Sequence, residues 1–274
     1  MNGIVGVHGV GNYRPGETPE AASRQLSATW HHNLSMNVPD PSRLDVAYYA
    51  DLLRQPGRQG QGDSLDALSP EAETMLRVWL TSVGVPEAVS QGWGTWPMRQ
   101  ALAWVAERKR VAPRLLELFV STFFREVSTY LGPADSARTA ARDRVVNLIR
   151  DRKPRTVIAH SLGSVVAYEA LWACPDEPVD LLITLGSPLA MPHVVFPRLD
   201  PRPADERGAR PPGVARWVNL ADPGDLIALP PGGLSRRFTG VDTDDHDVVH
   251  AFDFHLAANY LRCERLAKEL LPNA

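Results

Sequence analysis

The sequence predicts an α/β fold with a mostly parallel central sheet flanked by helices, and two observations support this class. Apolar runs rich in Val, Ile and Leu predict strands at residues 3–8, 44–50, 156–160, 180–188 and 215–222. Segments with apolar residues at helical spacing separate these runs, and strands that alternate with helices favour a parallel sheet. The 274 residues, 44% of them hydrophobic, suffice for a sizeable core, so we expect residues 1–274 to form a single domain.

The first part of the chain begins with the predicted strand 3–8. A helix is expected over 18–34, because Thr18 is a good N-cap and Pro19 suits the first helical position. The second strand, 44–50, is rich in β-branched and aromatic residues. The polar, glycine-rich stretch that follows it predicts a loop.

A long helical block follows this loop. Apolar residues recur at helical spacing from about residue 65 to residue 131, with a break over 84–97. Because this block interrupts the alternation of strands and helices, we expect residues 60–135 to form a helical insertion within the domain.

The second half of the chain returns to regular alternation. The predicted order is helix 136–154, strand 156–160, helix 164–174, strand 180–188, strand 215–222 and a closing helix 255–271. The stretch 197–213 is rich in Pro, Arg and Gly and predicts a surface loop.

Bulk properties exclude several function classes. The formal net charge is −3 and no run of Lys and Arg forms a basic patch, so we expect no nucleic-acid partner. Cys174 and Cys263 lie far apart without metal-like spacing, which favours a reduced, cytoplasmic protein without a metal or other cofactor. The N-terminus lacks the pattern of a secretory signal, and no apolar run is long enough for stable membrane insertion.

The strongest functional signal is the stretch "TVIAHSLGSVVAYEAL", residues 156–171. A strand, a sharp turn with Ser161 and a helix form the context of a nucleophile elbow, in which the residues two before and two after the serine must be small. Those residues are Ala159 and Gly163, so the G-x-S-x-G pattern holds except for one methyl group. The alternative interpretation is that Ser161 only caps the following helix.

The stretch "VHGVGN", residues 7–12, predicts a second part of the same site. A His-Gly pair at the end of an N-terminal strand matches the H-G-x-G oxyanion loop, and the expected donors are the N–H groups of Val10 and Leu162. A dinucleotide-binding loop is disfavoured because the glycines lie in the wrong register, and a plain tight turn remains as an alternative. We expect substrate to be bound by residues of the two loops, namely His8, Gly9, Gly11 and His160.

A carboxylate is expected in "WVNLADPGDLIALPP", residues 217–231, where a strand ends in a polar turn. A triad acid there would orient a histidine and stabilise its positive charge. Asp225, which precedes small apolar residues and prolines, is favoured over Asp222, which then caps the turn.

The base is expected after the acid and before the last helix. Three histidines occupy this stretch, "DDHDVVHAFDFHLAANYL". His255 is favoured because it opens the closing helix, and His250 and His246 are the alternatives.

The chain order Ser161, Asp225, His255 is the order found in α/β-hydrolases. Together with "LITLGSPL" and "HLAANYL", these motifs give a sequence that resembles the α/β-hydrolase superfamily, nearest to its lipase and esterase branch. The resemblance implies an α/β-hydrolase fold in which the helical insertion acts as a cap. It implies a serine hydrolase that acts on a small-molecule acyl substrate, a carboxylic ester, thioester or lipid, through an acyl-Ser161 intermediate.

Two other functions use the same residues or the same scaffold. One is a biosynthetic acyltransferase or cyclase with the same triad that excludes water from the site. The other is a non-catalytic binding protein, for which a lost triad member is the expected signature.

Overall fold

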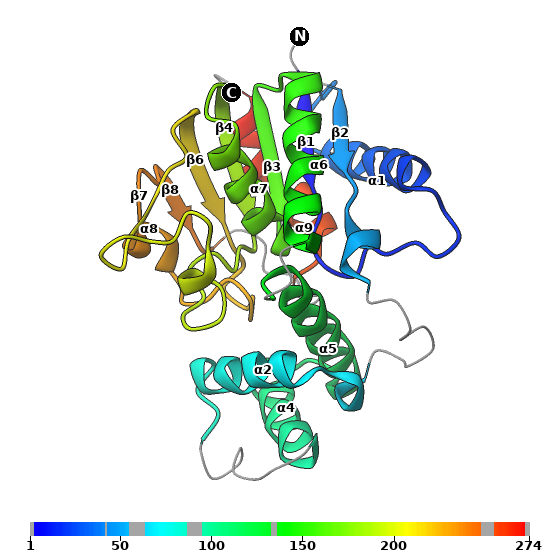
Figure 1. The fold of residues 1–274 in the computed structure, drawn as a ribbon, viewed down its shortest axis with the longest axis vertical. Helices are drawn as coiled ribbons and strands as arrows, with labels where there is room; N and C mark the ends of the chain where they lie inside the picture. Colours follow the sequence, from blue (N-terminus) through cyan, green and yellow to red (C-terminus); the bar gives the residue numbers. More distant parts are fainter. Residues whose placement is uncertain are drawn as a thin grey trace.

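The computed structural model has one six-stranded sheet in which every neighbouring pair of strands is parallel, with helices on both faces (Figure 1). It describes residues 3–41, 43–54, 64–86, 95–132, 136–247 and 255–271. The strand order is β2-β1-β3-β4-β6-β8. The predicted α/β class is confirmed.

The five predicted strands all occur, each within a residue or three of its expected ends. The strands of the main sheet are β1 Ile4–Val7, β2 Leu44–Ala47, β3 Thr156–His160, β4 Val179–Leu185, β6 Val214–Leu220 and β8 Thr243–Asp245, and β5 Gly208–Ala209 pairs with β7 Phe238–Thr239 apart from it. The α-helices are α1 Pro19–Leu34, α2 Pro70–Ser82, α4 Thr95–Lys109, α5 Pro113–Tyr130, α6 Ser136–Arg152, α7 Leu162–Ala173, α8 Gly233–Arg237, α9 Ala257–Leu261 and α10 Glu264–Leu270. Short 3-10 turns occupy Ala50–Leu53, Leu65–Ala67 and Phe196–Arg198.

Two apolar clusters cover the two faces of the sheet. Helices α6 and α7 lie on one face, and α1 and α9 lie on the other (Figure 1). Strand β3 shows why, because alternate side chains of a strand point to opposite faces. Val157 and Ala159 belong to the cluster under α7, whereas Ile158 belongs to the cluster with α1 and α9.

The order of the strands reverses at β1, and this reversal defines a topological switch point. The chain passes from β1 to β2 on one side and later returns to β3 on the other side of β1. The loops that leave the carboxyl ends of β1 and β3 therefore diverge, and ligands of open parallel sheets bind at such a switch point. The two motifs singled out in the sequence, at 7–12 and 159–163, lie on these two loops.

The predicted helical block forms α2, α4 and α5. In Figure 1, α2 and α4 lie beyond the carboxyl ends of the strands, and α5 runs from them toward the sheet. Helices α2 and α4 both pack against α5. The indole Nε1 of Trp79 on α2 also donates to the carbonyl of Leu226, in the loop after β6, at 2.8 Å. The block therefore lies over the end of the sheet that carries the predicted site.

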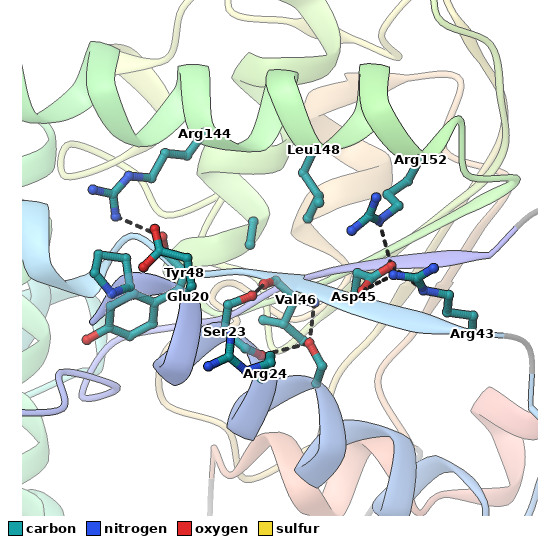
Figure 2. Close-up of a pocket in the computed structure, with 13 residues that line it drawn as sticks. Glu20, Ser23, Arg24, Arg43, Asp45, Val46, Tyr48, Arg144, Leu148 and Arg152 are labelled. Carbon is teal, nitrogen blue, oxygen red and sulfur yellow. Dashed lines mark hydrogen bonds and ion pairs between the residues drawn. The ribbon is translucent and has the colours of Figure 1, made fainter. Parts of the chain in front are cut away.

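The edge strand β2 is shielded by α1 rather than left open. An edge strand presents unpaired backbone groups that invite pairing with another chain. The Ser23 hydroxyl donates to the carbonyl of Val46 at 2.6 Å, and the Ser27 hydroxyl accepts from the N–H of Val46 at 2.8 Å (Figure 2). A surface pocket lies between β2, α1 and α6 (Figure 2), and three of the arginines that line it are paired with acids of the protein, as Arg152 is with Asp45 at 2.8 Å. The two serines thus satisfy both backbone groups of Val46 on β2.

Two features of the C-terminal region differ from the sequence-based expectation. The helix expected over 255–271 is divided into α9 and α10, because Cys263 adopts an extended backbone and its Sγ caps α10 through the N–H of Leu266. Strand β8 was not predicted, since its residues are acidic and its stability comes from side-chain bonds at the sheet edge. In particular, Asn219 on β6 donates to Asp244 on β8 at 2.8 Å. Among the described residues, no helix combines the length and apolarity that crossing a membrane requires.

Candidate active site

Ser161 occupies the sharp corner between β3 and α7. Its φ of 55° and ψ of −131° lie in a region that residues with a side chain rarely adopt, which marks a strained turn. The corner is possible because Gly163 is small: a Cβ there would lie 2.3 Å from the carbonyl oxygen of Val7 and 2.4 Å from that of His8. The requirement for a small residue two positions after the serine therefore has a direct steric cause.

Three side chains from distant parts of the sequence meet at this corner. His255 Nε2 lies 2.7 Å from Ser161 Oγ. On the other side of the ring, His255 Nδ1 lies 2.7 Å from Asp225 Oδ2 and 2.9 Å from Oδ1. Because a carboxylate only accepts, Nδ1 carries the hydrogen, and Nε2 is left to accept the hydroxyl proton of Ser161. All three residues are buried.

The carboxylate of Asp225 is held on both oxygens. Oδ1 accepts from the N–H of Ile227 at 2.8 Å, and Oδ2 accepts from the hydroxyl of Tyr260 at 2.7 Å. Burial opposes ionisation, but the charge on His255 and the hydrogen bonds from His255, Tyr260 and Ile227 outweigh it and hold the pKa of Asp225 below its ordinary value. Asp225 is therefore an ionised acid in contact with the imidazole.

The alternative residues lie elsewhere. Asp222 Oδ1 accepts from the N–H of Gly224 at 2.6 Å and thus caps the turn before Asp225. His246 Nε2 bonds Asp244 Oδ1 at 2.9 Å, at the far edge of the sheet. His250 lies outside the described residues.

The predicted oxyanion loop lies against Ser161. A Cβ on Gly9 would be 2.6 Å from the Cβ of Ser161, so the backbone of the loop approaches Ser161 as closely as only glycine allows. Leu162 is the first residue of α7, where an N–H has no acceptor within the helix. Within the described ranges of the chain, the N–H of Val10 likewise has no hydrogen-bond acceptor. Both predicted donors therefore lie close to Ser161. Leu162 follows it in the sequence, and Val10 follows Gly9, whose backbone packs against Ser161.

His8 and Gly11, which were expected to bind substrate, make hydrogen bonds to other residues of the protein. The N–H of Tyr49 donates to His8 Nε2 at 3.2 Å, so His8 Nδ1 carries the hydrogen and donates to the carbonyl of Gly9 at 2.7 Å. Burial lowers the pKa of His8 to about 4. The N–H of Gly11 donates to both carboxylate oxygens of Glu126 on α5, at 3.2 Å. These contacts hold the loop in place.

His160 lies beside the imidazole of His255, with the ring centroids 4.9 Å apart. Burial, and then the charge on His255, hold the pKa of His160 well below its ordinary value. Its Nε2 is buried and has no hydrogen-bond partner in the part of the chain that the structure describes. His160 is therefore a neutral ring packed against the site.

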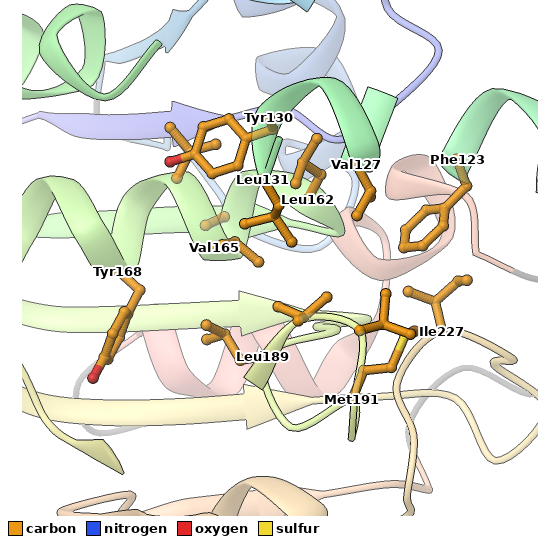
Figure 3. Packing of buried hydrophobic residues seen from close by; sticks show 14 of the residues in the cluster. Phe123, Val127, Tyr130, Leu131, Leu162, Val165, Tyr168, Leu189, Met191 and Ile227 are labelled. Carbon is orange, nitrogen blue, oxygen red and sulfur yellow. The ribbon is translucent and has the colours of Figure 1, made fainter. Parts of the chain in front are cut away.

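Apolar side chains close the space in front of Ser161. Phe119 on α5 contacts the ring of His255 edge-on, with centroids 5.1 Å apart. Figure 3 shows Phe123 of α5 facing side chains from loops at the end of the sheet, Met191 and Ile227 among them. Ser161 has no exposed surface. The Ser161 hydroxyl is therefore closed off from solvent in this structure.

Four residues that contact the site had no signal strong enough to be found in the sequence. They are Phe119, Phe123, Glu126 and Tyr260. Phe119, Phe123 and Glu126 belong to the helical block, where each looks like an ordinary helix residue. Tyr260 follows His255 by five residues within "HLAANYL", and its proximity to the base was the only available indication.

Comparison of the chain with protein-family models, with curated proteins and with solved structures gives no match. Nor do the described residues contain a group of three or more His, Cys, Asp or Glu side chains placed to hold a metal ion. The functional assignment therefore depends on the geometry of the site.

Proposed function

We propose that this chain is a serine hydrolase with an α/β-hydrolase fold, of the lipase and esterase type, that cleaves a carboxylic ester. The observation that carries the proposal is the unbroken hydrogen-bonded chain from Ser161 Oγ through His255 to Asp225. Its members follow β3, β6 and β8 in the order Ser, Asp, His, which supports the finer fold assignment. In this proposal the helices of the segment 60–135 serve as a cap.

In the first half of the reaction, Ser161 Oγ bonds to the carbonyl carbon while its proton passes to His255 Nε2. Asp225 holds the ring and stabilises the imidazolium. The N–H groups of Val10 and Leu162 donate to the oxyanion, and each such donor typically contributes about 3 kcal/mol. The bond to the leaving oxygen then breaks, and His255 returns the proton to that oxygen, so that an alcohol departs.

In the second half, water attacks the acyl carbon and gives its proton to His255 Nε2. The bond between the carbonyl carbon and Ser161 Oγ breaks, and the proton passes from the imidazolium to Oγ. A carboxylic acid is released and the enzyme is restored. Every group that moves a proton in this scheme is a side chain of the triad.

A fluorophosphonate probe tests the nucleophile, because an activated serine displaces fluoride and forms a bond from Oγ to phosphorus. We expect the protein to be labelled on Ser161, as located by mass spectrometry, and labelling to vanish in Ser161→Ala. Ser164→Ala is the matched control, since the Ser164 hydroxyl is equally buried but bonds the Ser161 carbonyl and Ser187 rather than the imidazole. Absence of labelling in the unmodified protein, or labelling that survives Ser161→Ala, contradicts the proposal.

Acyl transfer to a nucleophile other than water is a second candidate, and the apolar cover over Ser161 favours it. Phe119 and Phe123 pack at the base, and a site closed in this way excludes water. Product analysis distinguishes the two: p-nitrophenyl esters of graded length are incubated with and without hydroxylamine. Release of p-nitrophenol that requires the added nucleophile indicates a transferase, and release in water alone indicates a hydrolase.

A further inference from the structure

Tyr260 provides the link between the loop that carries the acid and the segment that carries the base. It lies on α9, five residues after His255, and is 1% exposed. Its hydroxyl accepts from the N–H of Asp222 at 2.9 Å and contacts Asp225 Oδ2 at 2.7 Å. A single hydroxyl therefore bonds two positions of the loop after β6.

The direction of these two hydrogen bonds follows from their chemistry. A backbone N–H only donates, so the Tyr260 oxygen accepts from Asp222. The hydroxyl hydrogen is then directed to the carboxylate of Asp225. Burial, and then the neighbouring charge of Asp225, raise the pKa of Tyr260 far above its usual range, so the donor keeps its hydrogen.

The Tyr260 hydroxyl bonds the carboxylate oxygen of Asp225 that receives no hydrogen bond from the backbone. The N–H groups of Ile227 and Ala228 both bond Oδ1 of Asp225, at 2.8 and 3.3 Å. Oδ2, which makes the shorter contact with His255 Nδ1, receives the Tyr260 hydroxyl. Because the terminal torsion of an aspartate is soft, anchoring one oxygen alone leaves the other free to swing.

We propose that Tyr260 is a positioning residue whose hydroxyl fixes the Asp225 carboxylate in the orientation that supports His255. The inference rests on the proposed function, in which His255 is the base. Asp225 and His255 face four polar or titratable groups among the described residues. These are Ser161 after β3, His160 on β3, Asp222 in the loop after β6, and Tyr260 itself. From α5, the described ring contacts with His255 are the apolar Phe119 and Phe123.

The test compares Tyr260→Phe with Tyr130→Phe. Tyr130 is the matched control, because its buried hydroxyl also donates to a carboxylate at 2.7 Å, that of Glu169, outside the triad. The first readout is the titration of the His255 ring followed by NMR. The second is the rate of fluorophosphonate labelling against pH.

In Tyr260→Phe the carboxylate turns away and stabilises the imidazolium less. We expect the His255 titration and the acid limb of the labelling profile to move down by about 0.5–1 pH unit. We expect labelling at neutral pH to slow by roughly 10-fold or more, as is typical when a group that orients the base is lost. Tyr130→Phe should leave the titration midpoint and the rate as they are.

An unchanged titration and rate would overturn the inference. So would an upward shift, because it means that the carboxylate stays in place and that the hydroxyl only withdrew charge from it. If the unmodified protein is not labelled on Ser161, the proposed function fails, and the NMR titration still decides the role of Tyr260.

One measurement needs no variant and covers the case in which Tyr260→Phe does not fold. A hydroxyl held between Asp222 and Asp225 should give a slowly exchanging proton resonance in the unmodified protein, with a nuclear Overhauser effect to the His255 ring. A Tyr260 hydroxyl in fast exchange with water would overturn the inference.

Discussion

His255 and His8 are both buried near Ser161, at 4% and 1% exposure, yet they contact different partners. The ring of His255 lies between a hydroxyl and a carboxylate. The ring of His8 lies between a backbone carbonyl and a backbone N–H. The comparison shows that burial alone does not place an imidazole between a hydroxyl and a carboxylate. A proton acceptor also needs a neighbouring anion that stabilises its charged form and a neighbouring hydroxyl to deprotonate.

Replacing His255 and His8 in turn tests this comparison, and the loss of rate in the His255 variant is the largest effect that we expect. His255→Gln removes the base, and we expect the rate of ester cleavage or labelling to fall by roughly 10⁴- to 10⁶-fold. His8→Gln keeps a side chain able to bond the backbone, so we expect a loss of less than about 10-fold. Pre-steady-state labelling of folded protein measures both. A comparable loss in the two variants would mean that His8 takes part in the chemistry.

The two aspartates of the acid loop provide the next test. Asp225→Asn removes the charge that stabilises the imidazolium, and we expect a loss of about 10⁴-fold in kcat. Asp222→Asn keeps an oxygen for the N–H of Gly224 and leaves the backbone N–H that bonds Tyr260 unchanged, so its kcat should stay within a few-fold. Steady-state kinetics on a p-nitrophenyl ester compares them. A larger loss in Asp222→Asn would reassign the acid.

The environment of His8 predicts a pH dependence of stability. Its folded pKa, about 4, lies below the ordinary value of 6.5, so the unfolded chain binds this proton first as pH falls. The stability that neutral His8 contributes is fully present above about pH 6.5 and is lost toward pH 4. The loss amounts to about 3 kcal/mol. His160 acts in the same direction.

Urea unfolding between pH 7 and pH 4 measures this dependence. The free energy of unfolding should fall less steeply with acid in His8→Gln than in the unmodified protein. The control is His31→Gln, which changes an exposed residue of α1 and should leave the slope as it is. Equal slopes in His8→Gln and the unmodified protein would contradict the assignment of His8 as a neutral buried group.

The smallest effect that we expect is a change in labelling rate when Phe119, whose ring covers one side of His255, is replaced. Phe119→Ala removes the ring that contacts His255, and we expect labelling by a bulky fluorophosphonate to rise about two- to tenfold, since opening of the cover limits access. Leu118→Ala alters an exposed neighbour on the same helix and is the control. Unchanged labelling in Phe119→Ala would mean that substrate enters by another route.

Most strands and helices were predictable because the local pattern of apolar and turn residues favours the same element that the folded protein contains. The strand 156–160, the sharp corner at Ser161 and the helix after it are encoded in consecutive residues. The closing helix was predicted as one piece because its apolar spacing continues through Cys263, whose extended backbone carries no sequence signal. Strand β8 was missed because its acidic residues are stabilised by bonds to side chains far away in the chain.

The class of fold, the sharp turn at Ser161 and a short list of candidate acids and bases could all be predicted before folding was considered, because each depends on residue types at fixed local spacing. Only the tertiary structure placed Asp225 and His255 within 2.7 Å of each other. The fold likewise brings Tyr49 to His8, Phe119 to the ring of His255 and the Tyr260 hydroxyl to Asp225. These pairings join residues that lie between 30 and 136 positions apart in the sequence, and no local pattern encodes contacts over such separations.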